Sequence, residues 1–261
     1  MDVKIGAFIL CYNEEKYLEK AIQSLLPFVD GIIAVEGAWD YLVRQNFPKR
    51  STDGTIDILK KYESKYPDKM IVVHRNEEEC TKQYQVALDI LKEKKFSWGF
   101  CCDSDEVYPP DTLRVIRRTL EQTMGNVFGY RTHSYNFINS YFEYYNGLYP
   151  RLYRVTDDMA TVSENRVAWP SHGKQQDSME NPPLSHIKEI NSMFRFFHYS
   201  YVDIDRFKRR LKYMWATRGS ADPELVKKYY LDEQNKIHIP EDLKIFQFKG
   251  KHPEIMRDII Q

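Results

Sequence analysis

Two hydrophobic periods alternate along the first hundred residues. Short apolar runs, each bounded by polar residues, predict buried strands at residues 3–10, 31–35, 70–74 and 96–102. Between them, apolar residues recur at helical spacing and predict helices around residues 18–25, 56–62 and 84–91. Strand and helix in this rhythm predict an α/β fold, with a mostly parallel sheet flanked by helices.

The pattern changes after residue 125. Strand-like runs at 127–133 and 148–154 flank an aromatic-rich piece, and residues 156–190 hold prolines and polar residues typical of loops. A further strand-like run, 193–202, contains His198. The last part predicts helices beginning after Asp205 and around residues 223–231 and 254–260. We therefore expect three parts, at residues 1–125, 126–202 and 203–261, the last a helical extension.

Composition narrows the class of protein. The 261 residues carry 38 Lys and Arg against 38 Asp and Glu, and this zero net charge argues against a nucleic-acid binder. The longest apolar run, 5–11, is too short to span a bilayer, and no secretory signal is expected at the N-terminus. The four cysteines lack zinc-ligand spacing, which favours reduced thiols and a cytoplasmic location.

Polar side chains follow each predicted strand of the first half. In open parallel sheets, ligands bind at the carboxyl ends of the strands, so these residues are candidates for a binding site. In chain order they are Tyr12, Asn13, Glu14, Glu36, Arg75, Asp103 and Asp105.

The pair Asp103 and Asp105 has the chemistry of a metal site. Two carboxylates at i and i+2 after a buried strand point the same way in extended geometry, and hard oxygen ligands suit Mg²⁺ or Mn²⁺. The alternative is a solvated acidic turn. His198 is the best-placed third ligand, although a histidine among aromatic residues is more often structural.

Structural alternatives exist for the other candidates as well. Asn13 and Glu14 also suit the cap of the following helix, and Glu36 could be an ordinary loop acid. Asp53 lies in the segment 51–54, which has the residues of a helix N-cap.

Four segments taken together resemble a known family. They are residues 9–15, 32–37, 51–55 and 102–106, and their order and content are similar to the family 2 glycosyltransferases of GT-A fold over about residues 3–125. The resemblance implies a nucleoside-diphosphate sugar donor, a divalent metal at the Asp103-Ser104-Asp105 element, and transfer with inversion.

The resemblance also implies roles for individual residues at the positions that match the family's motifs. The resemblance implies that Asp103, Asp105 and His198 hold Mn²⁺ or Mg²⁺. For nucleotide-sugar binding it implies Tyr12, Asn13, Glu14, Glu36, Asp53 and Asp103. Arg75 is a further candidate because it follows the third predicted strand.

The chain departs from the family in two places. Residues 38–50 are inserted before the Ser51-Thr52-Asp53-Gly54-Thr55 element, and Gly173 stands where an acidic base is expected. An inverting transfer needs a base that reaches the acceptor hydroxyl. Our hypothesis is His172 first and Glu164 second, with two further carboxylates nearby, Asp177 and Glu180.

Partners follow from the same interpretation. The aromatic-rich residues 130–201 are expected to bind a carbohydrate or glycolipid acceptor. The basic run 206–212 is most simply the solvated face of a helix, but it could instead contact the diphosphate or anionic lipid at a membrane surface.

Three alternatives differ from a glycosyltransferase. One is a protein of the same fold that binds nucleotide-sugar without transferring it. The segment 103–107 also resembles the nucleophile loop of haloacid-dehalogenase-like phosphatases, but it follows four strands and no later metal element accompanies it. Sugar-nucleotide pyrophosphorylases begin with a glycine-rich phosphate loop, which residues 11–14 lack.

Overall fold

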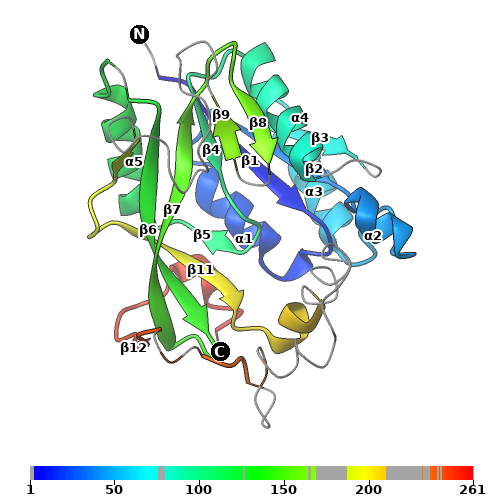
Figure 1. Ribbon diagram of the computed structural model, residues 1–261, viewed down its shortest axis with the longest axis vertical. Coiled ribbons are helices and arrows are strands. Elements are labelled where there is room, and N and C mark those ends of the chain that lie inside the picture. The colour runs from blue at the N-terminus through cyan, green and yellow to red at the C-terminus, as the bar shows by residue number, and fades with distance from the viewer. Residues whose placement is uncertain are drawn as a thin grey trace.

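A computed structural model describes residues 3–75, 80–125, 127–163, 166–168, 187–209, 231, 236–239, 241 and 243–260. Its main feature is one large mixed sheet with helices packed along it (Figure 1). The strands follow one another across the sheet in the order β3-β2-β1-β4-β7-β6-β11-β5.

The N-terminal half is the parallel part of the sheet. It comprises β1 (Ile5–Cys11), β2 (Gly31–Glu36), β3 (Met70–His74) and β4 (Trp98–Cys101), all parallel. The connecting helices are α1 (Glu15–Leu25), α3 (Thr55–Lys65) and α4 (Cys80–Glu93). The α/β class predicted from the sequence is confirmed, as are these strands and helices.

Both faces of this parallel half are buried. Ile9 points into the core that α1 covers with Leu18 and Ile22, whereas the neighbouring Phe8 packs against Leu88 of α4 on the other face. Alternate residues of a strand point to opposite faces, so a strand covered on both sides is apolar throughout. This explains the continuous apolar runs in the sequence.

The second half of the sheet is partly antiparallel. The hairpin of β6 (Gly129–Ile138) and β7 (Glu143–Arg154) joins β4 to β11 (Arg195–Tyr201) and β5 (Glu106–Val107). The predicted strands 127–133 and 148–154 were too short, because the aromatic residues between them continue the hairpin. The remaining elements are α5 (Pro110–Glu121), which was not predicted, and β8 (Ala160–Ser163), β9 (Arg166–Ala168), β10 (Ile187–Glu189) and β12 (Phe246–Gln247).

The inserted residues 38–50 pack beside the carboxyl ends of β1 and β2. They include a short helix, α2 (Asp40–Arg44). The Trp39 indole donates to Gln83 of α4, and the Tyr12 hydroxyl donates to the Pro48 carbonyl at 2.7 Å. The insertion is therefore attached to the edge of the sheet where the candidate residues lie.

The C-terminal segment 243–260 covers an aromatic cluster. Its members include Phe137 of β6, Phe197 and Tyr199 of β11, and Phe248. The segment holds β12 and the 3₁₀ helix η2 (Glu254–Met256), so the helix predicted around 254–260 is present but shorter than expected. Of the helix predicted at 223–231, all but Leu231 lies outside the described residues. No helix in the described ranges is long and apolar enough to cross a membrane.

His252 fastens this segment to the cluster. Its Nε2–H donates to the Tyr141 carbonyl at 2.8 Å, and its Nδ1 accepts from the Tyr199 hydroxyl at 3.0 Å. Burial lowers the pKa of His252, against the effect of the Tyr141 carbonyl, which raises it. The folded chain therefore holds this imidazole in its neutral form.

A pH dependence of stability follows from His252. As the pH falls below about 6.5, the unfolded chain takes up a proton that the folded chain resists, so the free energy of unfolding falls. The loss amounts to about 1.4 kcal/mol for each unit by which the pKa is lowered. Urea unfolding of wild type and His252→Gln at pH 8 and pH 5 measures it. The wild type should lose more stability than the variant, and equal losses would contradict this role of His252.

Candidate active site

The candidate residues of the first half lie along one edge of the sheet. Cys11, Glu36 and His74, the last residues of β1, β2 and β3, are paired in register. Asp103 follows β4, which neighbours β1 on the other side. The structure thus places the polar residues that follow these strands side by side, as the sequence predicts.

The segment after β1 is bonded to the segment before α3. Asn13 adopts a left-handed conformation (φ 55°), which asparagine tolerates better than most residues. Its backbone N–H donates to Ser51 Oγ at 2.9 Å, and its side-chain Oδ1 accepts from the Thr52 N–H at 2.8 Å. Glu14 N–H donates to Thr55 Oγ1 at 2.7 Å. These bonds give the two segments one fixed arrangement.

Asp53 has the capping contacts considered in the sequence analysis. Its Oδ1 accepts from the Thr55 N–H at 3.0 Å, at the start of α3, and its Oδ2 accepts from the Glu15 N–H at 3.2 Å. The carboxylate therefore supports the same two segments, whatever contact it makes with a ligand.

Glu36 is fully buried rather than a loop acid. Its Oε1 accepts from the Ser51 N–H at 2.8 Å, and its Oε2 accepts from Arg50 Nε at 2.7 Å and lies 3.1 Å from His74 Nδ1. Arg50 belongs to the insertion, so the insertion supplies the cation that pairs with this carboxylate. Arg75 follows β3, is exposed, and donates its backbone N–H to the Glu36 carbonyl.

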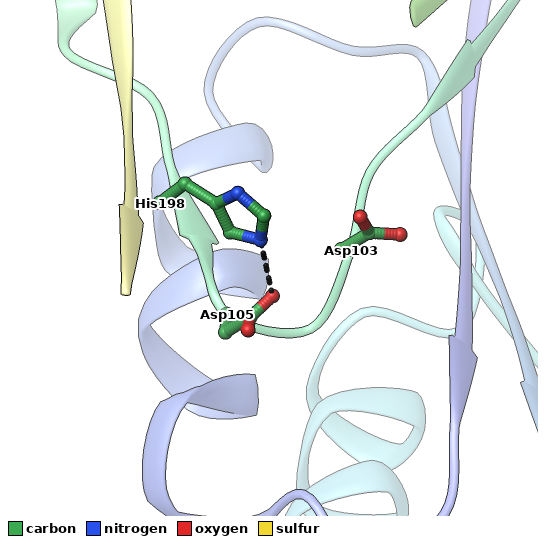
Figure 2. Close-up of side chains that lie close together, drawn as sticks. All are labelled: Asp103, Asp105 and His198. Atoms are coloured by element: carbon green, nitrogen blue, oxygen red, sulfur yellow. Dashed lines mark ion pairs between the residues drawn. The ribbon is translucent and has the colours of Figure 1, made fainter. Parts of the chain in front are cut away.

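Asp103, Asp105 and His198 come together as the sequence predicts. Figure 2 shows the His198 ring extending from β11 toward the loop that carries both aspartates. One ligand atom from each residue lies within 4.8 Å of the other two, and His198 Nε2 is 3.3 Å from Asp105 Oδ1. Two carboxylate oxygens with one imidazole nitrogen are a donor set that Mn²⁺ accepts readily and Mg²⁺ accepts through its oxygens. The residues present therefore fit a divalent metal.

A buried arginine on β7 orients Asp103. Arg151 Nη2 donates to Asp103 Oδ2 at 2.7 Å and also to Glu106 Oε1. Glu106 is completely buried, and burial raises its pKa to about 7, although Arg151 lowers it. Asp103 itself is 41% exposed in its side chain, so one oxygen is held by Arg151 while the group still reaches solvent.

A second buried arginine orients Asp105. Arg206 Nη1 donates to Asp105 Oδ2 at 2.7 Å, and its Nε and Nη2 lie 2.8 and 2.7 Å from Glu14 Oε2. The side chains of Arg206 and Asp105 are only 3% and 2% exposed. Asp105 Oδ2 is therefore paired with Arg206, while Oδ1 faces His198.

Residues 204–209 are helical, as predicted after Asp205. The prediction that the basic run 206–212 is a solvated helix face is wrong for Arg206, which is buried. Arg206 points inward onto two carboxylates, whereas Arg209 is exposed. Residues 210–212 lie outside the described part of the chain. Lys16 of α1 adds a contact to this segment through Asp203, at 2.7 Å.

His198 is charged more readily than a free histidine. Burial disfavours the imidazolium, but the charge and hydrogen bond of Asp105, helped by the charges of Glu106 and Asp103, raise the pKa of His198 above its usual value. On its other side, His198 Nδ1 lies 2.9 Å from Asn136 Oδ1.

Sequence reasoning missed several residues of this site. Arg151 lies in a run that was interpreted only as a strand, and Arg206 in a run interpreted as a helix face. Asn136 lies in the aromatic-rich piece, where polar residues at 132, 134 and 136 alternate and could have predicted a strand with a polar face. Both candidate bases, His172 and Glu164, lie outside the described residues, as do Asp177 and Glu180.

Among the described residues of the range 130–201, the aromatic side chains do not form one open surface. Phe137, Phe196 and Tyr199 are fully buried and pack the interior, while Tyr135, Tyr144 and others remain half-buried. The fully buried aromatic side chains therefore have no exposed face against which an acceptor sugar could pack.

Comparison with known proteins assigns the family. The sequence matches the family model for glycosyl transferase family 2 over residues 7–200. The chain belongs to glycosyl transferase family 2, and the phosphatase alternative is therefore not supported. No curated protein matches the chain in sequence.

Solved structures with a similar chain path are distant in sequence. S. aureus TarS is 16% identical with a TM-score of 0.47, and the match covers 87% of this chain and 41% of TarS. TarS 1–349 in complex with UDP is 15% identical, with a TM-score of 0.48 over 87% of this chain and 69% of that one. Glucosyl-3-phosphoglycerate synthase from Mycobacterium tuberculosis, in complex with Mn²⁺, UDP and phosphoglyceric acid, is 19% identical. Its TM-score is 0.34, and the match covers 50% of this chain and 43% of that one. The chain thus spans less than half of the TarS chain in the first of these structures.

Proposed function

We propose that the chain is a metal-dependent glycosyltransferase that moves a sugar from a nucleoside-diphosphate sugar to an acceptor hydroxyl, with inversion at the anomeric carbon. The observation that carries this proposal is the cluster of Asp103 and Asp105, which follow β4, with His198 of β11, in a chain of glycosyl transferase family 2. Its cofactor would be Mn²⁺ or Mg²⁺, its place of action the cytoplasm, and its acceptor a carbohydrate or glycolipid.

Each residue of the cluster has a distinct task. Asp103 and Asp105 would bind the ion through Oδ1, since Oδ2 of each lies on an arginine, and His198 would bind it through Nε2. When bound, the ion would neutralise charge that develops on the leaving diphosphate. Because the arginines already orient both carboxylates, little rearrangement is needed when the donor binds.

The nucleoside would lie along the edge formed by the ends of β1, β2 and β3. Tyr12, Asn13 and Glu14 follow β1 there, beside Arg75 and the Asp53 carboxylate. Glu36 would act from behind this surface, since both its oxygens have partners within the protein. Asp103, at the junction with the metal cluster, would contact both donor and metal.

Turnover of the donor tests the proposed function. We expect slow release of nucleoside diphosphate from one of the UDP-, GDP-, CDP- or dTDP-linked sugars, in the presence of Mn²⁺ or Mg²⁺ and not with chelator. Release follows because water can replace the acceptor in the transfer. A chain that binds a nucleotide-sugar but releases no diphosphate, even with acceptor extracts, would be a binding protein rather than an enzyme.

The general base is the part of the mechanism that rests on sequence alone. His172 is our first candidate and Glu164 our second, since either could take the proton of the acceptor hydroxyl. Loss of a general base slows transfer by about 100- to 10,000-fold. We expect this from His172→Ala or, failing that, Glu164→Ala in single-turnover assays. Near wild-type transfer rates in both variants would reject both assignments.

A further inference from the structure

One face of β6 carries polar side chains although it is buried. Thr132, Ser134 and Asn136 alternate along the strand and are each completely buried, so they share one face. Asn136 is paired in register with His198 on β11, and Ser134 with Gly147 on β7. A buried polar side chain costs free energy unless it has a hydrogen-bonding role.

The side-chain oxygen of Asn136 has a hydrogen-bonding role of this kind. Oδ1 lies 2.9 Å from His198 Nδ1 and 3.1 Å from the Ser134 hydroxyl. An oxygen can only accept, so His198 carries a proton on Nδ1 whether the ring is charged or neutral. The opposite nitrogen, Nε2, is the atom that faces Asp105. A neutral imidazole protonated on Nδ1 has its lone pair on Nε2.

The other end of the amide makes no such contact. Asn136 Nδ2 is buried and has no hydrogen-bond partner among the described residues. Rotating the amide would place Nδ2 against His198 Nδ1, which would then accept, and the ring proton would move to Nε2. In that form Nε2 has no lone pair to offer.

Gly147 leaves the space that this amide occupies. A Cβ at position 147 would come closer than 3.0 Å to Asn136 Nδ2, to Ser134 Oγ and to the Tyr149 ring. No side chain other than hydrogen fits there without displacing Asn136 or Ser134. The backbone of β7 thus fixes Asn136 from the side opposite His198.

We propose that Asn136 is the positioning residue of the metal site. It keeps the proton of His198 on Nδ1 and so presents the Nε2 lone pair to a divalent cation beside Asp103 and Asp105. This inference rests on the metal site of the proposed function. Groups that orient a metal-bound histidine in this way contribute about 10- to 100-fold to metal affinity.

Metal affinity, measured without nucleotide, tests the role of Asn136. We expect Asn136→Ala to bind Mn²⁺ about 10- to 100-fold more weakly than wild type in calorimetric titrations. Ser134→Ala, which removes the other partner of Oδ1 but leaves the bond to His198, is the matched control and should bind Mn²⁺ like wild type. Wild-type affinity in folded Asn136→Ala would overturn the proposal and leave the metal site standing.

Gly147→Ala acts on Asn136 from the neighbouring strand. It should weaken Mn²⁺ binding alone, yet add nothing when combined with Asn136→Ala, because the two changes act through the same amide. Additive losses would mean that position 147 affects the site by another route and would count against the proposal.

The tautomer of His198 provides a readout that needs no variant. Nitrogen NMR of histidine-labelled wild type with Mg²⁺ should show His198 protonated on Nδ1 and unprotonated on Nε2. Protonation on Nε2 in the Mg²⁺-loaded protein would overturn the proposal even if the variants fail to fold. Absence of any divalent-ion binding by wild type would instead overturn the metal site, and this inference with it.

Discussion

Replacing Asp105 by asparagine is expected to abolish metal-dependent nucleotide binding. Asp105 Oδ1 faces His198, and asparagine keeps the shape of the side chain while removing its charge. The loss should exceed the about 100-fold that follows removal of a group behind a metal ligand. Calorimetric titration of the nucleoside diphosphate with Mn²⁺ present measures it.

The fold should survive this substitution. Arg206 keeps its pair with Glu14, and asparagine can still accept from Arg206 through its amide oxygen. Asp57→Asn, an exposed position on α3, removes the same charge away from the site and should bind nucleotide like wild type. If Asp105→Asn retains wild-type nucleotide affinity with Mn²⁺, the assignment of Asp105 as a metal ligand is wrong.

Replacing Arg206 by methionine is expected to cause the largest loss of stability. Arg206 is the buried cation shared by Asp105 and Glu14, and methionine leaves both carboxylates without it. Removing one partner of a buried ion pair costs about 3–5 kcal/mol, and His198, which stays beside Asp105, offsets part of that cost. Urea unfolding of the metal-free protein at neutral pH measures this cost.

Two further variants separate this effect from a general loss of positive charge. Arg209→Met alters an exposed arginine of the same segment and should change the free energy of unfolding by less than about 0.5 kcal/mol. Combining Arg206→Met with Asp105→Asn should recover part of the stability, since one of the two buried negative charges that Arg206 had neutralised is gone. A loss below about 0.5 kcal/mol in Arg206→Met would show that the bridge contributes little.

The parallel half of the fold could be predicted because each element has a simple local signal. Phe8 and Ile9 are buried on opposite faces of β1, so the strand is apolar at every position and is recognised as a run. Leu18, Ile22 and Leu25 repeat at helical spacing because only one face of α1 meets the sheet. The order of these elements then predicts the edge at which Glu36 and Asp103 lie.

The antiparallel half was harder to predict for a physical reason. In the hairpin of β6 and β7, aromatic residues such as Tyr135 and Phe137 face one side, and Ser134 and Asn136 face the other. The polar face is the more buried of the two, so the usual contrast between buried apolar and exposed polar residues is absent. The sequence analysis assigned no role to Ser134 and Asn136 in the aromatic-rich piece and so missed this second face.

The paired arginines illustrate what one sequence does not contain. A basic residue in a helix pattern is normally solvated, and nothing local distinguishes Arg206 from Arg209. The difference arises because β11 and the segment after it bring Arg206 against Glu14 and Asp105, which are distant in the chain. Arg151 is a similar case, since its partners Asp103 and Glu106 lie on a different segment.

Calorimetric titration of wild type with UDP, GDP, CDP and dTDP, each with Mn²⁺ and again with chelator, tests the central claim most directly. The account predicts tight binding of one nucleotide that disappears with chelator, and this result would also name the donor base. If none of the four binds in a metal-dependent way, the cluster of Asp103, Asp105 and His198 is not a donor site and the proposed function is contradicted.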